Sequence, residues 1–402
     1  MSNSLGIIEV KTKKDKKDFI KFPYRLYKND RNWVPPLKSD IKKIVNDKNS
    51  QLFNNGPHKF FLAKRGREVV GRIAVGVDKK LNEYKEVNHA YFTLFESEEN
   101  QNTANLLMET AEKWAYKHKM IYLKGPVSPT NGDDYRGLLV NNFENPPTIL
   151  MPYNHPYYVD FFDEYDGYLK YYAFEYDPEK SLSDKQRRLA SIAMKRYDFT
   201  VKNADFSNLK KLSRKFYEVT KEAMPDWEED IIPPTYDEIL SMAKTLKLVA
   251  DPSLVAIAYS NDEPIGYFVA FPDFSDIIRK IKGNLFPLGW VRFLMDRGKI
   301  KRARGAILFV IPKFRNKGVP IAMFVKVLEA LKKKGFKTVE GSSISWKNFV
   351  MLTNAKKIGG RHYKTYVIYG KKLVKRELTM EELYGNASWK FKHDRLISIN
   401  SE

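Results

Sequence analysis

Residues 306–320 read Ala-Ile-Leu-Phe-Val-Ile-Pro-Lys-Phe-Arg-Asn-Lys-Gly-Val-Pro, and this stretch decides how the rest of the sequence is interpreted. The apolar run predicts a β-strand, and a basic loop containing one glycine follows it. The residues after the loop predict an amphipathic helix, because apolar side chains recur at helical spacing: Ala322, Phe324, Val325, Leu328 and Leu331. The first N–H groups of a helix have no partner within the helix, and the positive end of its dipole lies there. A strand, loop and helix in this order can therefore bind a phosphate group.

The loop itself has residues suited to that role. Gly318 allows close approach of the backbone, and Pro320 fits the first helical turn. Positive side chains add attraction for an anion. A basic, solvated turn explains the same residues equally well, and the glycine spacing matches neither GxxxxGK[ST] nor GxGxxG. The candidate phosphate-binding residues are Arg315, Asn316, Lys317, Gly318, Val319 and Pro320.

The chain also contains an internal repeat. The segments 61–78 and 255–273 both read as strand, polar turn and strand, and both end at an aspartate. Helical stretches, a later helix-to-strand passage and an aromatic strand recur in the same order. We therefore predict two tandem domains, residues 1–180 and 181–402, each of the α/β (α+β) class with a mixed, mainly antiparallel sheet flanked by helices.

Composition limits the function classes. The net charge of +21 favours a polyanionic partner, which includes nucleic acid, an anionic membrane surface and a phosphorylated cofactor. There is no cysteine, and His118, His155 and His362 have no metal-ligand spacing, so we expect no metal site. The start of the chain lacks an apolar signal-peptide core, and no run is long enough to span a membrane. These features predict a soluble, cytoplasmic protein.

The loop resembles the pyrophosphate-binding signature of the GNAT (N-acetyltransferase) superfamily, Arg/Gln-x-x-Gly-x-Gly/Ala. Arg315 and Gly318 match the signature, and Pro320 replaces its third small residue. The segment from Trp346 to Gly359 resembles the Asn-to-Gly segment of the superfamily, whose asparagine, here Asn348, lies near the coenzyme. The whole chain is similar to a bacterial family of tandem GNAT-like proteins of unassigned substrate, through Trp33-Val-Pro-Pro, Gly71-Arg-Ile-Ala, Tyr153-Asn-His-Pro-Tyr-Tyr and Tyr363-Lys-Thr-Tyr.

This resemblance implies an acyltransferase that moves an acetyl or longer acyl group from coenzyme A to an amine. The oxyanion of the reaction would be stabilised by a backbone N–H of Phe309, Val310 or Ile311. Glu340 is the candidate base, and the alternative for it is an exposed strand glutamate. The usual proton donor to the leaving thiolate is a tyrosine seven residues after the asparagine, but Ala355 stands there, so Tyr363 and Tyr366 become the candidates. The candidate amine-binding residues are Asp226, Trp227 and Glu228.

The first half departs from the signature. Residues 95–104 contain three glutamates and no glycine where its phosphate loop is expected. We therefore predict a degenerate first domain that does not bind the coenzyme.

Residues 271–304 form an insertion before the phosphate-loop strand, with nine Lys or Arg against three Asp and with apolar residues at helical spacing. Such a segment can lie on an anionic membrane or cover an acyl chain. It can equally pack on its own domain with its lysines in water.

Two other functions remain open. A Fem-type transferase is also a tandem of GNAT-like halves and uses aminoacyl-tRNA, which suits a basic protein. A non-catalytic acyl-CoA-binding protein would be consistent with Ala355. Nucleic acid is not expected as the primary partner, because the aromatic residues are not interleaved with lysines.

Overall fold

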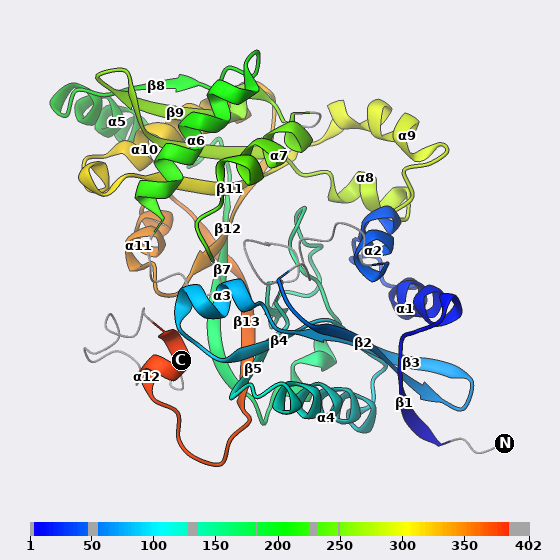
Figure 1. Ribbon diagram of the computed structural model, residues 1–402. Helices are drawn as coiled ribbons and strands as arrows, with labels where there is room; N and C mark the ends of the chain where they lie inside the picture. The colour runs from blue at the N-terminus through cyan, green and yellow to red at the C-terminus, as the bar shows by residue number, and fades with distance from the viewer. Residues whose placement is uncertain are drawn as a thin grey trace.

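A single continuous sheet runs through the protein in the computed structural model, which describes residues 4–46, 55–127, 136–181, 183–224, 231–247 and 250–385 (Figure 1). Its strands follow the order β1-β2-β3-β4-β5-β13-β7-β12-β11-β10-β9-β8, and the short β6 pairs with β13. Only the pairs β4–β5 and β11–β12 are parallel among the described strands. The predicted α/β class with a mainly antiparallel sheet is confirmed.

The two halves of the chain share most, but not all, of their order of elements. The first half contains β1 (Leu5–Glu9), α1 (Lys13–Leu26), α2 (Lys38–Val45), β2 (His58–Arg65), β3 (Glu68–Gly76), α3 (Lys79–Lys85), β4 (His89–Ser97), α4 (Gln101–Lys117), β5 (Tyr122–Gly125), β6 (Leu138–Leu139) and β7 (Asp166–Tyr176). The second half begins with α5 (Asp184–Arg196), β8 (Thr200–Asn203), α6 (Leu209–Ala223), α7 (Tyr236–Leu246), β9 (Val255–Ser260), β10 (Glu263–Pro272), α8 (Ser275–Lys280) and α9 (Gly289–Asp296). It continues with β11 (Arg302–Val310), α10 (Val319–Lys333), β12 (Thr338–Ser345), α11 (Phe349–Lys357), β13 (Arg361–Lys372) and α12 (Met380–Tyr384).

Local sequence explains the hairpins and the helix positions. Asn261 and Asp262 both adopt positive φ at the β9–β10 turn, a backbone conformation that these short polar residues tolerate in tight hairpins. Helix α10 buries eight of its residues against one face of the second-half strands, together with α5. Helix α6 packs on the opposite face. The second half is therefore a sheet covered by helices on both sides.

The last strands of the two halves are exchanged. Strand β7, which ends the first half, lies between β12 and β13, and β13, which ends the second half, pairs with β5 of the first half. The β7–β13 pair runs antiparallel from Arg361–Glu175 to Gly370–Asp166. The predicted ranges 1–180 and 181–402 divide the chain between β7 and α5, but they do not divide the sheet. Their independence as domains stays a prediction.

Of the helices in the described residues, none has the length and apolarity that crossing a membrane requires.

The strand exchange predicts that neither half folds alone. A fragment of residues 1–180 lacks β13 and so leaves the edges of β5 and β7 unpaired, which favours aggregation. We expect each fragment alone to show no cooperative thermal transition by circular dichroism. The two fragments expressed together should form a one-to-one complex with a single transition. A cooperative transition of the isolated 1–180 fragment would contradict the prediction.

Candidate active site

Strands β11 and β12 are paired only at their beginning. Their parallel pairing extends from Arg302–Thr338 to Gly305–Gly341. Beyond Gly305, β11 continues along β10 as far as Val310, and its other edge has no partner strand among the described residues. The backbone N–H and C=O groups on this edge of β11 are therefore available to a ligand, and they lie next to the candidate phosphate-binding loop.

The hydrogen bonds of β11 show which N–H groups face that edge. Ile311 donates its N–H to the Ile265 carbonyl at 3.0 Å, so it is already used within the sheet. Because successive residues of an antiparallel strand point their polar groups to opposite sides, Val310 points away from β10. Consistent with this, the Val310 carbonyl accepts a bond from Arg315 Nε at 3.3 Å. Of the three predicted oxyanion donors, Phe309, Val310 and Ile311, the geometry favours Val310.

The candidate phosphate loop lies between β11 and α10. Gly318 is the residue before the helix and has φ 75°, a conformation that favours glycine. A methyl group on it would come within 2.5 Å of Ala193 on α5, so the close packing of α5 requires glycine too. Helix α10 has no side-chain cap at its start. The first N–H groups of α10 are thus not satisfied by a capping side chain.

The other loop residues differ in exposure. Arg315 and Asn316 are exposed, Lys317 and Pro320 are half-buried, and Val319 is buried. Arg315 also donates from Nη2 to the Ala223 carbonyl at 2.6 Å, which ties the loop to the end of α6. The ammonium group of Lys317 lies over the rings of Phe314 and Tyr197. Their role in binding a phosphate stays a prediction.

The matching helix start in the first half is occupied by protein groups. Asn100 caps α4 by accepting from the Thr103 N–H at 3.1 Å, and Glu98 accepts from the Thr103 hydroxyl and from Arg65. Glu96 is turned inward, where it accepts hydrogen bonds from Tyr27 and Tyr158. Glu96 and Glu98 are thus both engaged in hydrogen bonds within the fold.

Glu340 lies at the end of the paired segment of β12, and it is buried with 1% of its surface exposed. Its carboxylate accepts from Thr148 Oγ1 at 2.6 Å, from Ser342 Oγ at 2.5 Å and from the Tyr363 hydroxyl. The alternative of an exposed strand glutamate is wrong. The structure brings Glu340 and Tyr363 together, while their catalytic role stays a prediction.

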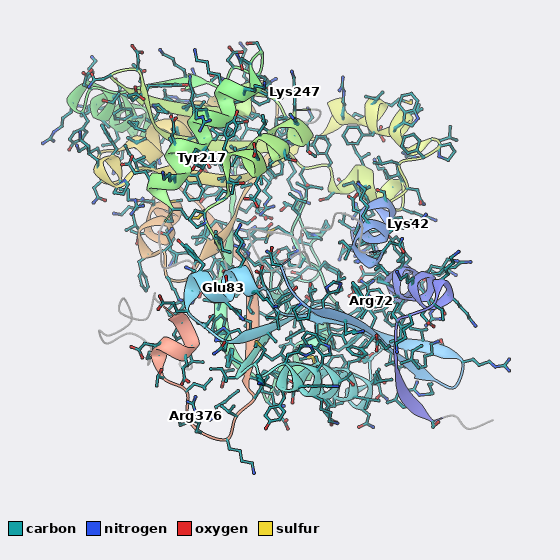
Figure 2. All side chains as sticks on the ribbon, in the orientation of Figure 1. Lys42, Arg72, Glu83, Tyr217, Lys247 and Arg376 are labelled. Atoms are coloured by element: carbon teal, nitrogen blue, oxygen red, sulfur yellow. The ribbon has the colours of Figure 1, made fainter. Side chains whose placement is uncertain are left out.

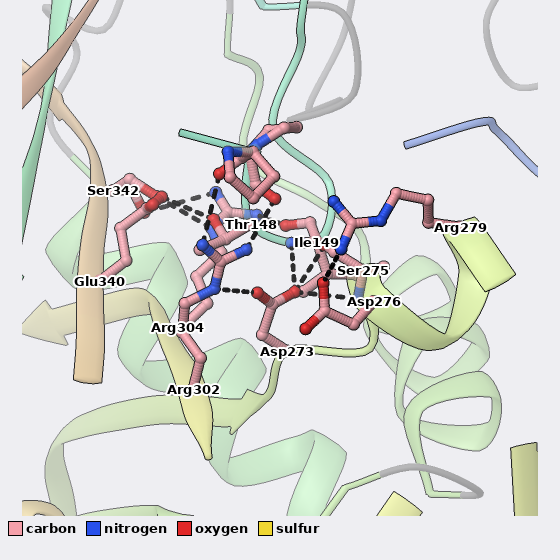
Figure 3. A network of polar contacts seen from close by, with 12 residues as sticks. Thr148, Ile149, Asp273, Ser275, Asp276, Arg279, Arg302, Arg304, Glu340 and Ser342 are labelled. Carbon is pink, nitrogen blue, oxygen red and sulfur yellow. Dashed lines mark hydrogen bonds and ion pairs between the residues drawn. The ribbon is translucent and has the colours of Figure 1, made fainter. Parts of the chain in front are cut away.

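The sequence did not reveal the cations beside this carboxylate. Arg304 is completely buried and donates to the Ser342 hydroxyl and the Ile149 carbonyl, at 3.0 Å each. Arg302 pairs with Asp273 and donates to the Pro147 carbonyl at 2.8 Å (Figure 3). These arginines were counted among the charges of the 271–304 insertion, but they lie on β11 and bind a loop of the first half.

The two candidate tyrosines have different environments. Burial, and next the Glu340 carboxylate, raise the pKa of Tyr363 far above its usual value, so its phenol stays protonated. Tyr366 is buried with a hydroxyl that has no hydrogen-bond partner among the described residues, and burial likewise raises its pKa. Burial lowers the pKa of the neighbouring Lys364 to about 8, although the nearby Glu340 carboxylate acts to raise it. The Lys364 ammonium donates hydrogen bonds to two backbone carbonyls of the first half.

A third tyrosine lies beside the position of the missing proton donor. Ala355 is buried on α11, and Tyr176 of β7 lies close to it. A methyl group on Gly360 would come within 2.5 Å of the Tyr176 ring, and one on Gly341 within 3.1 Å of the ring and 3.6 Å of the hydroxyl. Gly341 is where β11–β12 pairing ends. The sequence could not show this neighbour, because Tyr176 reaches the second half only through the strand exchange.

Other predicted site residues are less informative. Asn348 caps α11 by accepting from the Met351 N–H at 3.1 Å. Asp226, Trp227 and Glu228 lie outside the described residues. Within the described ranges, no cluster of His, Asp or Glu has the arrangement of a metal site.

The fold is that of tandem GNAT proteins. A tandem GNAT protein from the clavulanic acid biosynthesis pathway is similar with a TM-score of 0.55 and 10% identity, over 93% of this chain and 100% of that chain. A GCN5-related N-acetyltransferase from Sphaerobacter thermophilus is similar with a TM-score of 0.50 and 11% identity, over 92% of this chain and 98% of that chain. The expectation of two GNAT-like halves is confirmed at the level of the fold.

Two relatives are similar in sequence over nearly the whole chain. A protein named bacterial ceramide synthase, from Caulobacter vibrioides, is 29% identical over 92% of this chain and 98% of its own length. Protein YghO of Escherichia coli is 24% identical over 90% of this chain and 94% of its own length. No protein-family model matches the sequence.

The buried network predicts a large effect of Glu340→Ala on stability. The substitution leaves three hydroxyl donors without their acceptor and removes the negative charge beside Arg302 and Arg304. We expect the free energy of unfolding, measured with urea, to fall by about 3–5 kcal/mol. Tyr363→Phe should cost about 1–2 kcal/mol. Glu263→Ala, which removes an exposed strand glutamate, is the control and should leave the midpoint unchanged. Equal effects of the two Glu→Ala variants would contradict the role of the network.

Proposed function

We propose that this protein is an N-acyltransferase that moves an acyl group from a coenzyme A thioester to the amine of a long-chain amino alcohol. The observation that carries the proposal is the unpaired edge of β11 leading into the uncapped start of α10. Backbone N–H groups on that edge suit the thioester arm, and the helix start suits its phosphates. The similarity to a protein named ceramide synthase supports the acceptor class, since a ceramide is the amide of a fatty acid with a long-chain amino alcohol.

The proposed reaction uses groups of both halves. The amine attacks the thioester carbonyl, and the Val310 N–H stabilises the oxyanion that forms. The C–S bond then breaks, the thiolate leaves and takes up a proton, and the amine loses one. Glu340 is too deeply buried to touch the amine, so its half-buried partner Tyr363 relays that proton to the carboxylate. The hydrogen bond from the Tyr363 hydroxyl to the Glu340 carboxylate joins the relay to the base.

Tyr176 is our candidate for the donor to the thiolate. Its hydroxyl makes no hydrogen bond to a described group, and it points along β12 toward the end of the β11–β12 pairing. Burial raises its pKa above the ordinary phenol value, so it holds its proton throughout the neutral range. This assignment supplies from β7 the phenol that Ala355 lacks.

Coenzyme binding tests the first part of the proposal. We expect acetyl-CoA or palmitoyl-CoA to bind in isothermal titration calorimetry, and Arg315→Ala and Lys317→Ala each to weaken binding about tenfold by removing a charge from the loop. Lys333→Ala is the control, because it removes an exposed lysine from the opposite end of α10. Transfer is then measured as release of free thiol with sphinganine as the acceptor. Binding without any transfer would favour the non-catalytic alternative, and no binding would refute the proposal.

Two Tyr→Phe variants test the proton donor. Tyr176→Phe should lower kcat about 10-fold to 100-fold while the dissociation constant of coenzyme A stays unchanged. Tyr366→Phe should leave kcat unchanged and should not lower stability, because it removes a buried hydroxyl that has no partner in the part of the chain that the structure describes. An unchanged kcat of Tyr176→Phe, or a loss confined to Tyr366→Phe, would reject Tyr176 as the donor.

A further inference from the structure

The insertion between β10 and β11 exposes an unusual amount of apolar surface. It forms two short helices, α8 and α9. Phe274, Ile277 and Ile281 of its first part are buried. The apolar side chains of the second part are exposed instead. Their exposed fractions are Phe286 81%, Leu288 74%, Met295 69%, Leu294 49%, Trp290 48% and Val291 37%.

Helix α9 directs its apolar side chains away from the protein. At 100° per residue, Trp290, Val291, Leu294 and Met295 share one side of the helix, and all four are exposed. Phe293 points inward and packs on Phe274 at 4.9 Å between ring centroids. A surface helix of a globular protein normally places its polar side outward. An exposed apolar patch of this kind marks an interaction surface.

The charges of the insertion indicate which partner fits. Each of its three aspartates is paired with a cation of the same segment: Asp273 with Arg302, Asp276 with Arg279, and Asp296 with Lys280, Arg292 and Lys299. Lys282 and Arg297, which precede and follow the exposed apolar residues in the sequence, are themselves exposed and have no acidic partner among the described residues. The surface thus combines aromatic and aliphatic side chains with a net positive charge, as interfacial membrane segments do.

The segment is fixed to the first half of the protein. The Lys38 N–H donates to the Gly283 carbonyl at 3.0 Å, and Arg279 donates to the Arg31 carbonyl at 2.8 Å. Helix α2, with the exposed Lys42, lies beside α8 (Figures 1 and 2). The apolar surface is therefore held in position by both halves.

We propose that Phe286, Leu288, Trp290, Val291, Leu294 and Met295, with Lys282 and Arg297, form a surface that docks the protein on an anionic lipid bilayer. This proposal rests on the proposed function and deepens it. A long-chain amino alcohol resides in a membrane, so an enzyme that acylates it has to reach the bilayer surface. The apolar side chains enter the boundary of the acyl chains, and the two cations bind anionic headgroups.

Co-sedimentation of the full-length protein with vesicles tests the proposal. Vesicles of phosphatidylcholine with phosphatidylglycerol should bind the protein, and pure phosphatidylcholine vesicles should bind it more weakly. The variant Phe286→Ser/Trp290→Ser/Leu294→Ser should lose at least about tenfold in partitioning. Lys282→Glu/Arg297→Glu should lose binding only to the anionic vesicles, about fivefold for each charge removed.

Controls separate this surface from folding and from catalysis. Leu189→Ser/Ile192→Ser removes similarly exposed side chains from α5, on the other side of the second half (Figure 1), and should bind vesicles normally. All variants should keep the thermal midpoint and the binding of coenzyme A, and transfer to a water-soluble amine should be unchanged. Vesicle binding without any transfer would refute the proposed function but not the docking surface. Equal partitioning of the triple variant and the unaltered protein would overturn the docking surface. So would an unaltered protein that forms a dimer and binds no vesicles, if the triple variant is a monomer.

Discussion

The antiparallel pairing of β7 with β13 is the constraint on which the rest of the structure depends. Each strand ends one half of the chain, and each is paired on both edges with strands that the other half supplies or shares. The sheet is therefore continuous, and removing either strand would expose two edges at its centre. An ordinary pair of domains in contact would lose an interface on separation, whereas these halves would lose part of their hydrogen-bonded framework.

The same pairing assembles the candidate active site from distant parts of the chain. Glu340 comes from β12, Tyr363 from β13, Tyr176 from β7 and Thr148 from a loop of the first half. Two cations beside them, the buried Arg304 and the half-buried Arg302, donate to carbonyls of that loop. Burying charges is unfavourable unless they are paired and hydrogen-bonded, so Arg302 and Arg304 fix the loop in one position. This explains why the first half remains necessary to the site even though the candidate coenzyme loop belongs to the second half.

Much of the fold could be predicted from the sequence, because the repeat and the apolar periodicity are local signals. The hairpin with Asn261 and Asp262, the strand before the loop and the helix after it all have the predicted form. Strand exchange could not be predicted, since β7 and β13 have the composition of central strands whichever neighbour they take. The environment of Glu340 was missed for the same reason, because its hydrogen-bond donors come from three separate segments. Arg304 was misjudged because charge in a sequence does not show whether a side chain faces water.

The starts of α4 and α10 differ in a way that supports the proposed coenzyme site. Helix α4 has Asn100 at its N-cap and Glu98 bound to Thr103, the arrangement that stabilises a helix by about 1 kcal/mol. Helix α10 has Gly318 at the same position, which offers no side chain and adopts a backbone conformation that other residues disfavour. Gly318 also lets Ala193 pack closely, so the glycine serves the fold as well as the loop.

Packing alone, however, does not explain why the first N–H groups of α10 remain uncapped beside an unpaired strand edge. Proteins leave helix starts uncapped and strand edges unpaired mainly where function requires it. Here the uncapped start of α10 and the unpaired edge of β11 occur together at the end of β11. This coincidence is the physical reason for our proposal that the coenzyme binds at the start of α10 and not at the start of α4.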